Sequence, residues 1–540
     1  MSRNNLLRDI LTFTAFSLAI LVAPLRAQVA YTDLYEFDDA HGCCVQYPGL
    51  LAQGQDGNLY GGTFSEGKYG YGTAFQMSVG GGLTTLHDFD SSDGAGVWGG
   101  LSMGLDGNFY GTTYQGGGQH FGTIFQVKPD GTFTPLYNFA NAGDGAYPKV
   151  PPTPAPDGNL YGVTGNGTVA VAYRITPAGK FTVLTTIPSQ SYSPLVLGGD
   201  GLLYGMTEYG GDFNQGTAFS LSTKGALKVI HSFNGGGDGA QPVSPLLLAA
   251  DGNFYGTTSD GGPQSGGVVF KLSPSGKYSV LHSFQSVDNA NGYAPTAGLV
   301  IGSDGFLYGF NSLGGALGDG TAFRLKTNGN NFTVLYTFDQ KNGGGSPEAT
   351  PILHTNGIIY GITQKGGLSD DGVFFSLDAT LKPFIALQLF YGKVGATIPI
   401  LGQGFNNAFE VQINGEYAPF LPMSDGYMLV YVTDTASSGK MAVYEYNGVS
   451  YISLQNFLLT PQIISFDPPS GPVGTKVTIQ GKGLVQIQGI GFGDRVPAQF
   501  SGGNGGDVFA TVPNGAKTGP IGIQTKGGLA ISSAKFTVTK

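Results

Sequence analysis

The sequence predicts an all-β fold, and three observations lead to this prediction. A Tyr-Gly pair recurs seven times between Tyr60 and Tyr360, at intervals of 43 to 53 residues. Each copy holds four short apolar segments separated by Gly-rich turns, a pattern typical of strands. Two segments near the C-terminus repeat each other at an offset of 79 residues. Together these patterns predict a seven-bladed β-propeller followed by two immunoglobulin-like β-sandwich domains.

Residues 1–27 have the order of a secretory signal peptide. Arg3 and Arg8 precede an uncharged apolar run at 10–25, and Ala27 is the small residue that ends the segment. The run is short for a membrane span, so we expect removal of 1–27 and a secreted, extracellular or cell-surface protein with no membrane span in the mature chain. A retained N-terminal anchor is the alternative.

The fifth copy shows the four segments most clearly. The apolar run 242–250 leads through an Asp-Gly turn into 253–258, and 268–273 and 277–284 follow after further turns. Asp-Gly supplies the positive φ of a tight hairpin, and the Tyr of the repeated phrase offers a flat ring for packing between blades. Four antiparallel strands repeated about every 50 residues are typical of a propeller, whose closed ring protects its sheet edges.

The fourth strand type, of form L-x-x-F, occurs once more than the others. The extra copy is 31–37, which lies ahead of the first full repeat. We expect 31–37 to supply the outer strand of blade seven, so that the propeller spans 28–381. The segment 383–390 also has the L-x-x-F spacing, but it begins the first of the two C-terminal repeats.

The C-terminal repeats divide the rest of the chain into domains of about 80 residues, 382–459 and 460–540. The second carries P-x-S-G-P-x-G-T-x-V-T-I-x-G-x-G and resembles IPT/TIG domains, while the first has a degenerate form of the pattern. The phrases DGNLYG, GTAF and VLHSF resemble the GloVer tandem repeat, which is found in exported bacterial proteins that carry varied surface anchors. That resemblance implies export and a propeller-like repeat, and it implies no reaction.

Composition and charge bear on the partners. The 540 residues carry a formal net charge of -10, so the protein repels nucleic acid phosphates. Glycans or cell-surface proteins are the expected partners. The only cysteines are the adjacent Cys43 and Cys44, which lack zinc-site spacing. They form a vicinal disulfide, pair with another molecule or remain thiols.

In propellers, function lies in variable loops on a rigid frame. The loop between the second and third strands and the crossover to the next blade open on one face, here called the variable-loop face. The crossovers bring Asp93, Asp144 and Asp238 to this face. In the outer strands, His87, His231 and His282 stand where other copies have Tyr, so we interpret them as packing residues. The loops supply the candidate ligand-binding residues: Glu66, Tyr69, Tyr71, Tyr114, His120, Tyr209, Asp212, Phe213, Asp260, Asp319, Asp370 and Asp371.

Aromatic rings with carboxylate acceptors suit sugars, whose C–H faces stack and whose hydroxyls donate hydrogen bonds. Turn formation explains the same Asp and Gly residues without any ligand. No phosphate-binding loop or H-E-x-x-H motif is present, so we expect no catalytic residues, metal or cofactor, although clustered Asp could hold a structural Ca²⁺. The sequence therefore predicts an exported, non-enzymatic binding protein for carbohydrate, with a carbohydrate hydrolase or lyase using paired carboxylates as the alternative.

Overall fold

The computed structural model describes residues 29–540 except 166–168, 288–289 and 504. The expected signal peptide, 1–27, lies outside the described residues. The described part of the chain is all-β, with one short 3-10 helix, η1 (Phe405–Asn407). None of its helices has the length and apolarity needed to cross a membrane.

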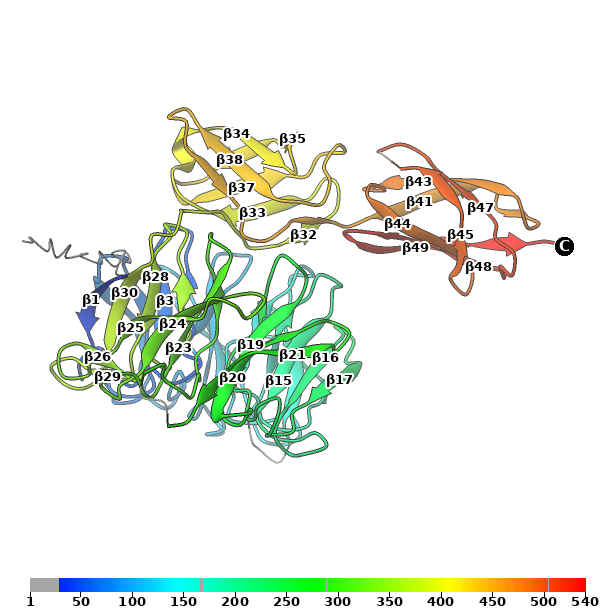
Figure 1. The fold of residues 1–540 in the computed structure, drawn as a ribbon. Coiled ribbons are helices and arrows are strands. Elements are labelled where there is room, and N and C mark those ends of the chain that lie inside the picture. Colours follow the sequence, from blue (N-terminus) through cyan, green and yellow to red (C-terminus); the bar gives the residue numbers. More distant parts are fainter. Residues whose placement is uncertain (1–28, 166–168, 288–289, 504) are drawn as a thin grey trace, which may run out of the picture.

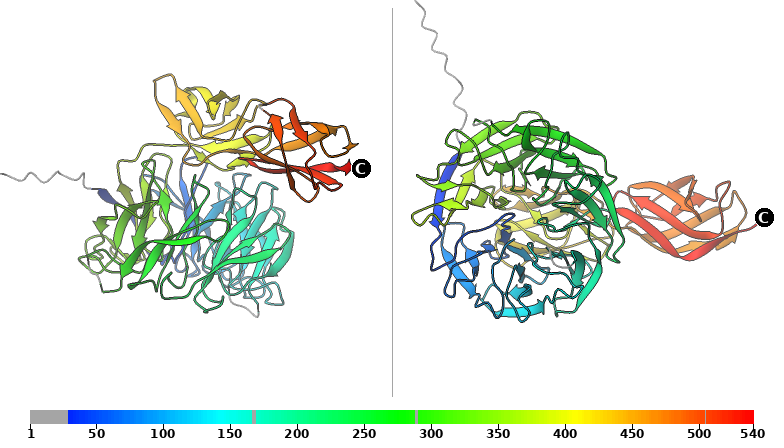
Figure 2. Two further views of the ribbon diagram at one scale, coloured as in Figure 1. Left: turned by 45° about the vertical axis from the view of Figure 1, so that its right-hand side comes forward. Right: turned by 90° about the horizontal axis from the view of Figure 1, so that it is seen from below.

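The first part of the chain forms four-stranded antiparallel sheets that stand around a common centre (Figure 2). Six of them follow chain order from the innermost strand outward. Their strands are β2 (Ala52–Gln53), β3 (Leu59–Gly62), β4 (Thr73–Met77) and β5 (Leu83–Asp88); β6 (Leu101–Met103), β7 (Phe109–Thr113), β8 (Thr123–Val127) and β9 (Phe133–Asn138); β10 (Thr153–Pro154), β11 (Leu160–Val163), β12 (Val171–Ile175) and β13 (Phe181–Thr186); β14 (Val196–Leu197), β15 (Leu203–Thr207), β16 (Thr217–Leu221) and β17 (Leu227–Ser232); β18 (Leu247–Leu248), β19 (Phe254–Thr258), β20 (Ser265–Leu272) and β21 (Tyr278–Gln285); β22 (Val300–Ile301), β23 (Phe306–Asn311), β24 (Thr321–Lys326) and β25 (Thr333–Thr337).

A seventh sheet combines the two ends of this region. Its strand order is β1-β30-β28-β27, built from β1 (Ala30–Glu36), β30 (Val373–Asp378), β28 (Ile359–Ile362) and β27 (Ile352–Leu353). Strand β1 pairs antiparallel with β30, with Ala30 opposite Asp378 and Glu36 opposite Val373. The N-terminal segment therefore supplies the outer strand of this sheet, and a small ribbon of β26 (Gly344–Gly345) and β29 (Lys365–Gly366) lies beside it.

The repeated phrase ties the Tyr hydroxyl to the Asp of its turn in six of the seven copies. The Tyr60 ring is fully buried and stacks on Phe109 of the next sheet, with ring centroids 3.7 Å apart. Its hydroxyl donates a hydrogen bond of 2.9 Å to Asp56 in the Asp-Gly turn. The phrase thus joins the turn to the second strand and one sheet to the next.

Two further β modules follow, each with two sheets around one hydrophobic core. The core of the first includes Ile398 and Val411, and that of the second includes Ile479 and Phe492. One sheet of the first module has the order β31 (Ala386–Leu387), β33 (Thr397–Leu401), β37 (Tyr427–Tyr431) and β36 (Phe420–Pro422). Its other sheet has the order β35 (Glu416–Tyr417), β34 (Ala408–Ile413), β38 (Met441–Glu445) and β39 (Ser450–Ile452). The strands β32 (Tyr391–Gly392) and β40 (Leu458–Leu459) form a separate pair. Strands of the second are β41 (Gln462–Asp467), β43 (Lys476–Lys482), β47 (Val508–Thr511) and β46 (Phe500–Gly502), then β42 (Ser470–Gly471), β49 (Gly528–Val538), β48 (Gly519–Thr525), β44 (Ile487–Phe492) and β45 (Val496–Ala498).

The first module lies over one face of the ring (Figure 1). Ser424 donates to the Gln55 carbonyl at 3.3 Å, and Gln455 donates to the Leu248 carbonyl at 3.2 Å. Both acceptors lie at or beside turns between first and second strands. The variable-loop face is at the other end of the sheets, where β26 and β29 lie (Figure 1).

Candidate functional site

One position in each copy lies just before the innermost strand, twelve residues ahead of the repeated Tyr. Trp98 before Tyr110 is one example. Neighbouring inner strands contact each other, as β2 contacts β6, so this position lies near the axis of the ring. Its occupants in chain order are Pro48, Trp98, Lys149, Tyr192, Val243, Thr296 and Glu348.

Aromatic side chains from separate sheets meet near this axis. Tyr47 precedes β2 and Tyr192 precedes β14, yet their ring centroids are 5.2 Å apart. Trp98 lies 5.0 Å from Tyr114 and 6.1 Å from Tyr192, and its indole N–H donates to the Tyr47 carbonyl at 2.8 Å. Residues of the first and fourth sheets can touch only close to the centre of the ring. We call Tyr47, Trp98, Tyr114, Lys149, Gln190, Tyr192 and Glu208 the axial cluster.

Lys149 is the cation of the axial cluster. The residue is 5% exposed, and its Nζ lies 3.6 Å from the centroid of the Tyr192 ring and 5.1 Å from that of Trp98. The ammonium donates to Gln190 Oε1 at 3.2 Å and to the Tyr192 hydroxyl. Burial lowers the pKa of Lys149 to about 8, and the negative charge of Glu208 opposes this shift. Lys149 is therefore largely charged at neutral pH, and aromatic faces stabilise that charge.

Two carboxyl groups lie in the same region. Glu208, just after β15, accepts a hydrogen bond from the Gln190 amide, and burial raises the pKa of Glu208. Burial also raises the pKa of Glu348 to about 7, and the charge of Lys365 opposes this shift. Burial raises the pKa of Tyr47, and the charges of Glu208 and Glu348 add to this shift, so both carboxyls lie near Tyr47. Both carboxyls are thereby shifted toward their neutral form.

The loop residues expected from the sequence fall into separate groups. Tyr114 belongs to the axial cluster, and Tyr209 hydrogen bonds to its neighbour Glu208. Burial raises the pKa of Asp371, and the charges of Asp39, Glu66 and Asp370 add to this shift, so these carboxylates lie near Asp371. The others lie on loops of different sheets: Tyr69, Tyr71, His120, Asp212, Phe213, Asp260 and Asp319.

Several of these carboxylates brace loops. Asp319 accepts a hydrogen bond from the Gln340 backbone N–H at 3.0 Å, and the Gln340 side chain donates to Asp370 at 2.9 Å. Asp260 accepts from the Gly261 N–H at 2.7 Å. The Asp260 bond is local to its turn, whereas the bonds of Asp319 and Asp370 to Gln340 join loops that are distant in the sequence.

The crossover aspartates also have structural partners. Asp93 accepts from His87 at 2.7 Å, and Asp144 accepts from Tyr137 at 2.8 Å. His231 and Asp238 are joined in the same way at 3.0 Å. Each pair ties a crossover to the outer strand before it, so these side chains are engaged within the fold.

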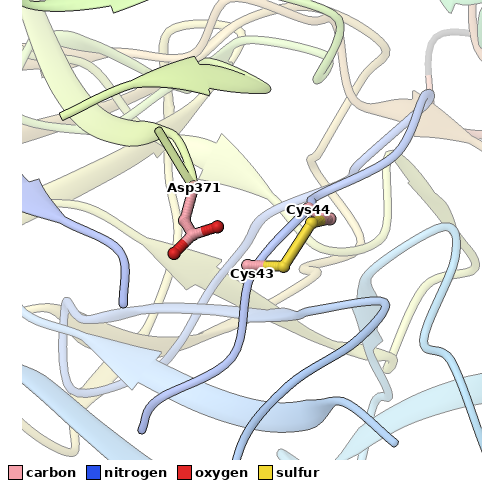
Figure 3. A group of neighbouring side chains, drawn as sticks. All are labelled: Cys43, Cys44 and Asp371. Atoms are coloured by element: carbon pink, nitrogen blue, oxygen red, sulfur yellow. A yellow bond between two sulfur atoms is a disulfide. The ribbon is translucent and has the colours of Figure 1, made fainter. Parts of the chain in front are cut away.

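Cys43 and Cys44 are joined by a disulfide, and the Asp371 side chain lies beside them (Figure 3). The Cys43 N–H donates to the Ser65 carbonyl at 2.9 Å, which ties the disulfide to the loop after β3. An oxygen of Asp371 lies within 4.8 Å of both sulfurs. Because thiolates are the metal-binding form of cysteine, these oxidised sulfurs do not make a metal site with Asp371. The structural Ca²⁺ stays a prediction.

Most of the axial cluster lies outside the loops that were expected to bind a ligand. Trp98, Lys149 and Tyr192 lie at the ends of crossovers. The sequence carries a signal for them, since the position twelve residues before each Tyr-Gly pair holds a different type of side chain in nearly every copy.

These features define a tandem-repeat, all-β protein with an asymmetric cluster of side chains at the centre of a ring of sheets. The chain belongs to the Gloeobacter/Verrucomicrobia repeat family, whose model matches residues 22–194 and 188–409. That match ends before 460–540, so the IPT/TIG resemblance stays a prediction. No curated protein matches the chain.

Similar solved structures share little sequence with this chain. A fungal alcohol oxidase of the AA5 family, in complex with copper, is 13% identical, with a TM-score of 0.44, over 80% of this chain and 98% of that one. A putative gluconolactonase is 12% identical, with a TM-score of 0.33, over 66% and 94%. A surface glycan-binding protein from Prevotella bryantii is 15% identical, with a TM-score of 0.23, over 35% and 43%. At this level of similarity they indicate no ligand or activity for this chain.

Proposed function

We propose that this is an exported, non-enzymatic binding protein that recognises carbohydrate with its axial cluster. In this proposal 1–27 is a signal peptide, 28–381 is a seven-bladed β-propeller, and 382–459 and 460–540 are immunoglobulin-like domains. The observation that carries it is the convergence of Tyr47, Trp98 and Tyr192 from three sheets.

The chemistry of the axial cluster suits a sugar. Aromatic rings offer faces on which the C–H groups of a pyranose stack. Lys149 and Gln190 supply donors, and Glu208 supplies an acceptor, beside those rings. The rings hold each other in place, as Trp98 does through its bond to the Tyr47 carbonyl, so little conformational entropy would be lost on binding.

The variable-loop face is the one from which we expect a ligand to approach. The first C-terminal module contacts turns at the opposite end of the ring, through Ser424 and Gln455. Tyr114 and Glu208 directly follow β7 and β15, at the ends of the strands that lead into the variable loops.

One observation favours a carbohydrate hydrolase or lyase as the second candidate. Burial raises the pKa of Glu348 to about 7, so this carboxyl is partly protonated at neutral pH, as a general acid must be. Glu208 would then be the second carboxyl of a catalytic pair. Turnover of a polysaccharide that Glu348→Gln abolishes would establish this alternative.

The test of the first proposal is a glycan-array screen of purified 28–540, followed by calorimetry. We expect Trp98→Ala to weaken binding of any array hit by at least about tenfold, because it removes a central stacking surface. The matched control is Phe213→Ala, because Phe213 is 58% exposed on a loop of the same face outside the axial cluster. Full affinity in the control, with unchanged melting temperatures, supports the axial site.

Two results would overturn the proposal. An array without a single hit would remove carbohydrate as the ligand. Loss of binding in Phe213→Ala but not in Trp98→Ala would move the site to the outer loops.

A further inference from the structure

Resting on the proposed function, we infer that the axial cluster selects a glycan with a single carboxylate-bearing sugar, and that the carboxylate pairs with Lys149. The inference concerns the ligand class, and it can fail while carbohydrate binding itself stands. It rests on the burial of Lys149, on its partners and on the charges around it.

The partners of the Lys149 ammonium are neutral. Its hydrogen bonds go to Gln190 and to the Tyr192 hydroxyl. Lys149 makes none of the ion pairs found in the described part of the chain. A lysine ammonium has three donors, so one N–H remains for a ligand. Taking an ammonium out of water is costly, and an anionic ligand oxygen would offset that cost.

The Gln190 side chain links the Lys149 ammonium to the Glu208 carboxyl. Gln190 accepts from Lys149 with its amide oxygen and donates to Glu208 with its amide nitrogen. The amide thus separates the two charges instead of letting them pair directly. Burial also raises the pKa of Glu208, which disfavours the charged form of this carboxyl.

The surrounding face limits how much charge the ligand can carry. Asp212, Asp260 and Asp370 are exposed on the loops that surround the axis, and the chain as a whole carries -10. A polysulfated or polyuronic chain would be repelled by these groups at low ionic strength. One carboxylate on an otherwise neutral glycan would meet Lys149 without placing further anions beside the acidic loops. A terminal uronic acid has this chemistry.

The experiment compares three ligands by calorimetry at pH 7: an oligosaccharide capped by glucuronic acid, its methyl ester, and the neutral oligosaccharide without the cap. We expect wild-type protein to bind the acid at least about tenfold more tightly than the ester, because only the acid forms a charge-assisted pair. Lys149→Met should remove this difference. The control Lys68→Met should keep it, because Lys68 is an exposed lysine on a loop of the same face.

Each outcome decides the inference. Equal affinity of wild-type protein for the acid and the ester overturns it, and this comparison needs no variant to fold. A preference for the acid that survives in a folded Lys149→Met protein also overturns it. Preference for a polyuronic chain over the capped oligosaccharide contradicts the single-carboxylate assignment. Binding of neutral sugars that depends on Trp98 but not on Lys149 refutes this inference alone, whereas no binding of any sugar refutes the proposed function.

Discussion

The repeated tyrosine is a hydrogen-bonded core residue. Six of the seven hydroxyls donate to the aspartate four residues earlier, as Tyr255 does to Asp251 at 2.8 Å, while the rings are 0 to 3% exposed. In the seventh copy the Asn356 side chain donates to the Tyr360 hydroxyl at 3.1 Å instead. The bond explains why the phrase keeps Tyr, since Phe would fill the same space but leave the turn carboxylate without this donor.

Two Tyr→Phe substitutions should therefore change stability in opposite directions. Tyr255→Phe removes a donor to a carboxylate and should lower the free energy of unfolding by about 1 to 2 kcal/mol. Tyr173→Phe should raise it by up to about 1 kcal/mol, because the Tyr173 hydroxyl is buried and has no hydrogen-bond partner in the described residues. Urea unfolding of both variants checks the signs, and two shifts of the same sign would contradict the role given to the Tyr255 bond.

The outer strands are joined by stacked rings. Residues of one outer strand stack on an aromatic ring of the next, as His87 does on Phe133 with centroids 3.7 Å apart and His282 on Phe332 at 3.9 Å. Tyr336 of β25 stacks in the same way on Tyr31 of β1 at 4.2 Å. These contacts support the interpretation of His87 and His282 as packing residues, and they give β1 the same neighbour contact as the other outer strands.

Burial of His282 makes this stack sensitive to acid. Burial lowers the pKa of His282 to about 4, whereas the pKa of a histidine in the unfolded chain is about 6.5. The unfolded chain thus binds the proton more strongly, so the contribution of His282 is complete above about pH 6.5 and is lost as the pH falls toward about 4. At pH 5 we expect a loss of about 1 to 2 kcal/mol.

The variant His282→Tyr should reduce this loss, since other copies carry Tyr at this position. The measurement is the difference in unfolding free energy between pH 7.5 and pH 5 for wild type and variant. His120→Asn is the control, because His120 is exposed on a loop. An unchanged acid loss in His282→Tyr, or an equal reduction in the control, would refute the assignment.

The molecule as a whole depends on the closure of the ring. Strand β1 follows directly after the expected signal peptide and pairs with β30, more than 300 residues later in the chain. This pairing covers the edge of the last sheet, and it brings the first copy next to the seventh. The axial cluster gathers residues that precede the inner strands of the first four sheets, so it depends on how these sheets curve around the axis.

Deletion of 28–37 should therefore destabilise the ring far more than deletion of 460–540. The first deletion exposes β30, and we expect the melting temperature to fall by about 5 °C or more. Deletion of 460–540 should leave the melting temperature of the ring nearly unchanged. The hydrogen bonds of Ser424 and Gln455 to the ring come from the first module, which this variant keeps. Should the deletion of 28–37 not fold, Tyr31→Ala tests the same closure through the loss of its stacking on Tyr336. Equal melting temperatures of all three variants and the wild type would contradict the role of β1.

Local patterns carried most of the information about architecture. Apolar segments of strand length, Asp-Gly turns and the spacing of the Tyr-Gly pairs depend on neighbouring residues, so the sequence alone determined an all-β chain of repeated four-stranded units. The surplus strand 31–37 could also be counted in the sequence, and its residues 31–36 lie within β1 beside β30.

Only the tertiary structure decided which side chains meet. Tyr47, Lys149 and Tyr192 are separated by more than 40 residues at each step, and they converge because inner strands point their ends at a shared axis. Acidic loop residues are instead engaged within the fold, as Asp260 is by the Gly261 N–H and Asp319 by the Gln340 N–H. Spacing along the chain is a local property, whereas convergence at the centre follows from the curvature and closure of the entire ring.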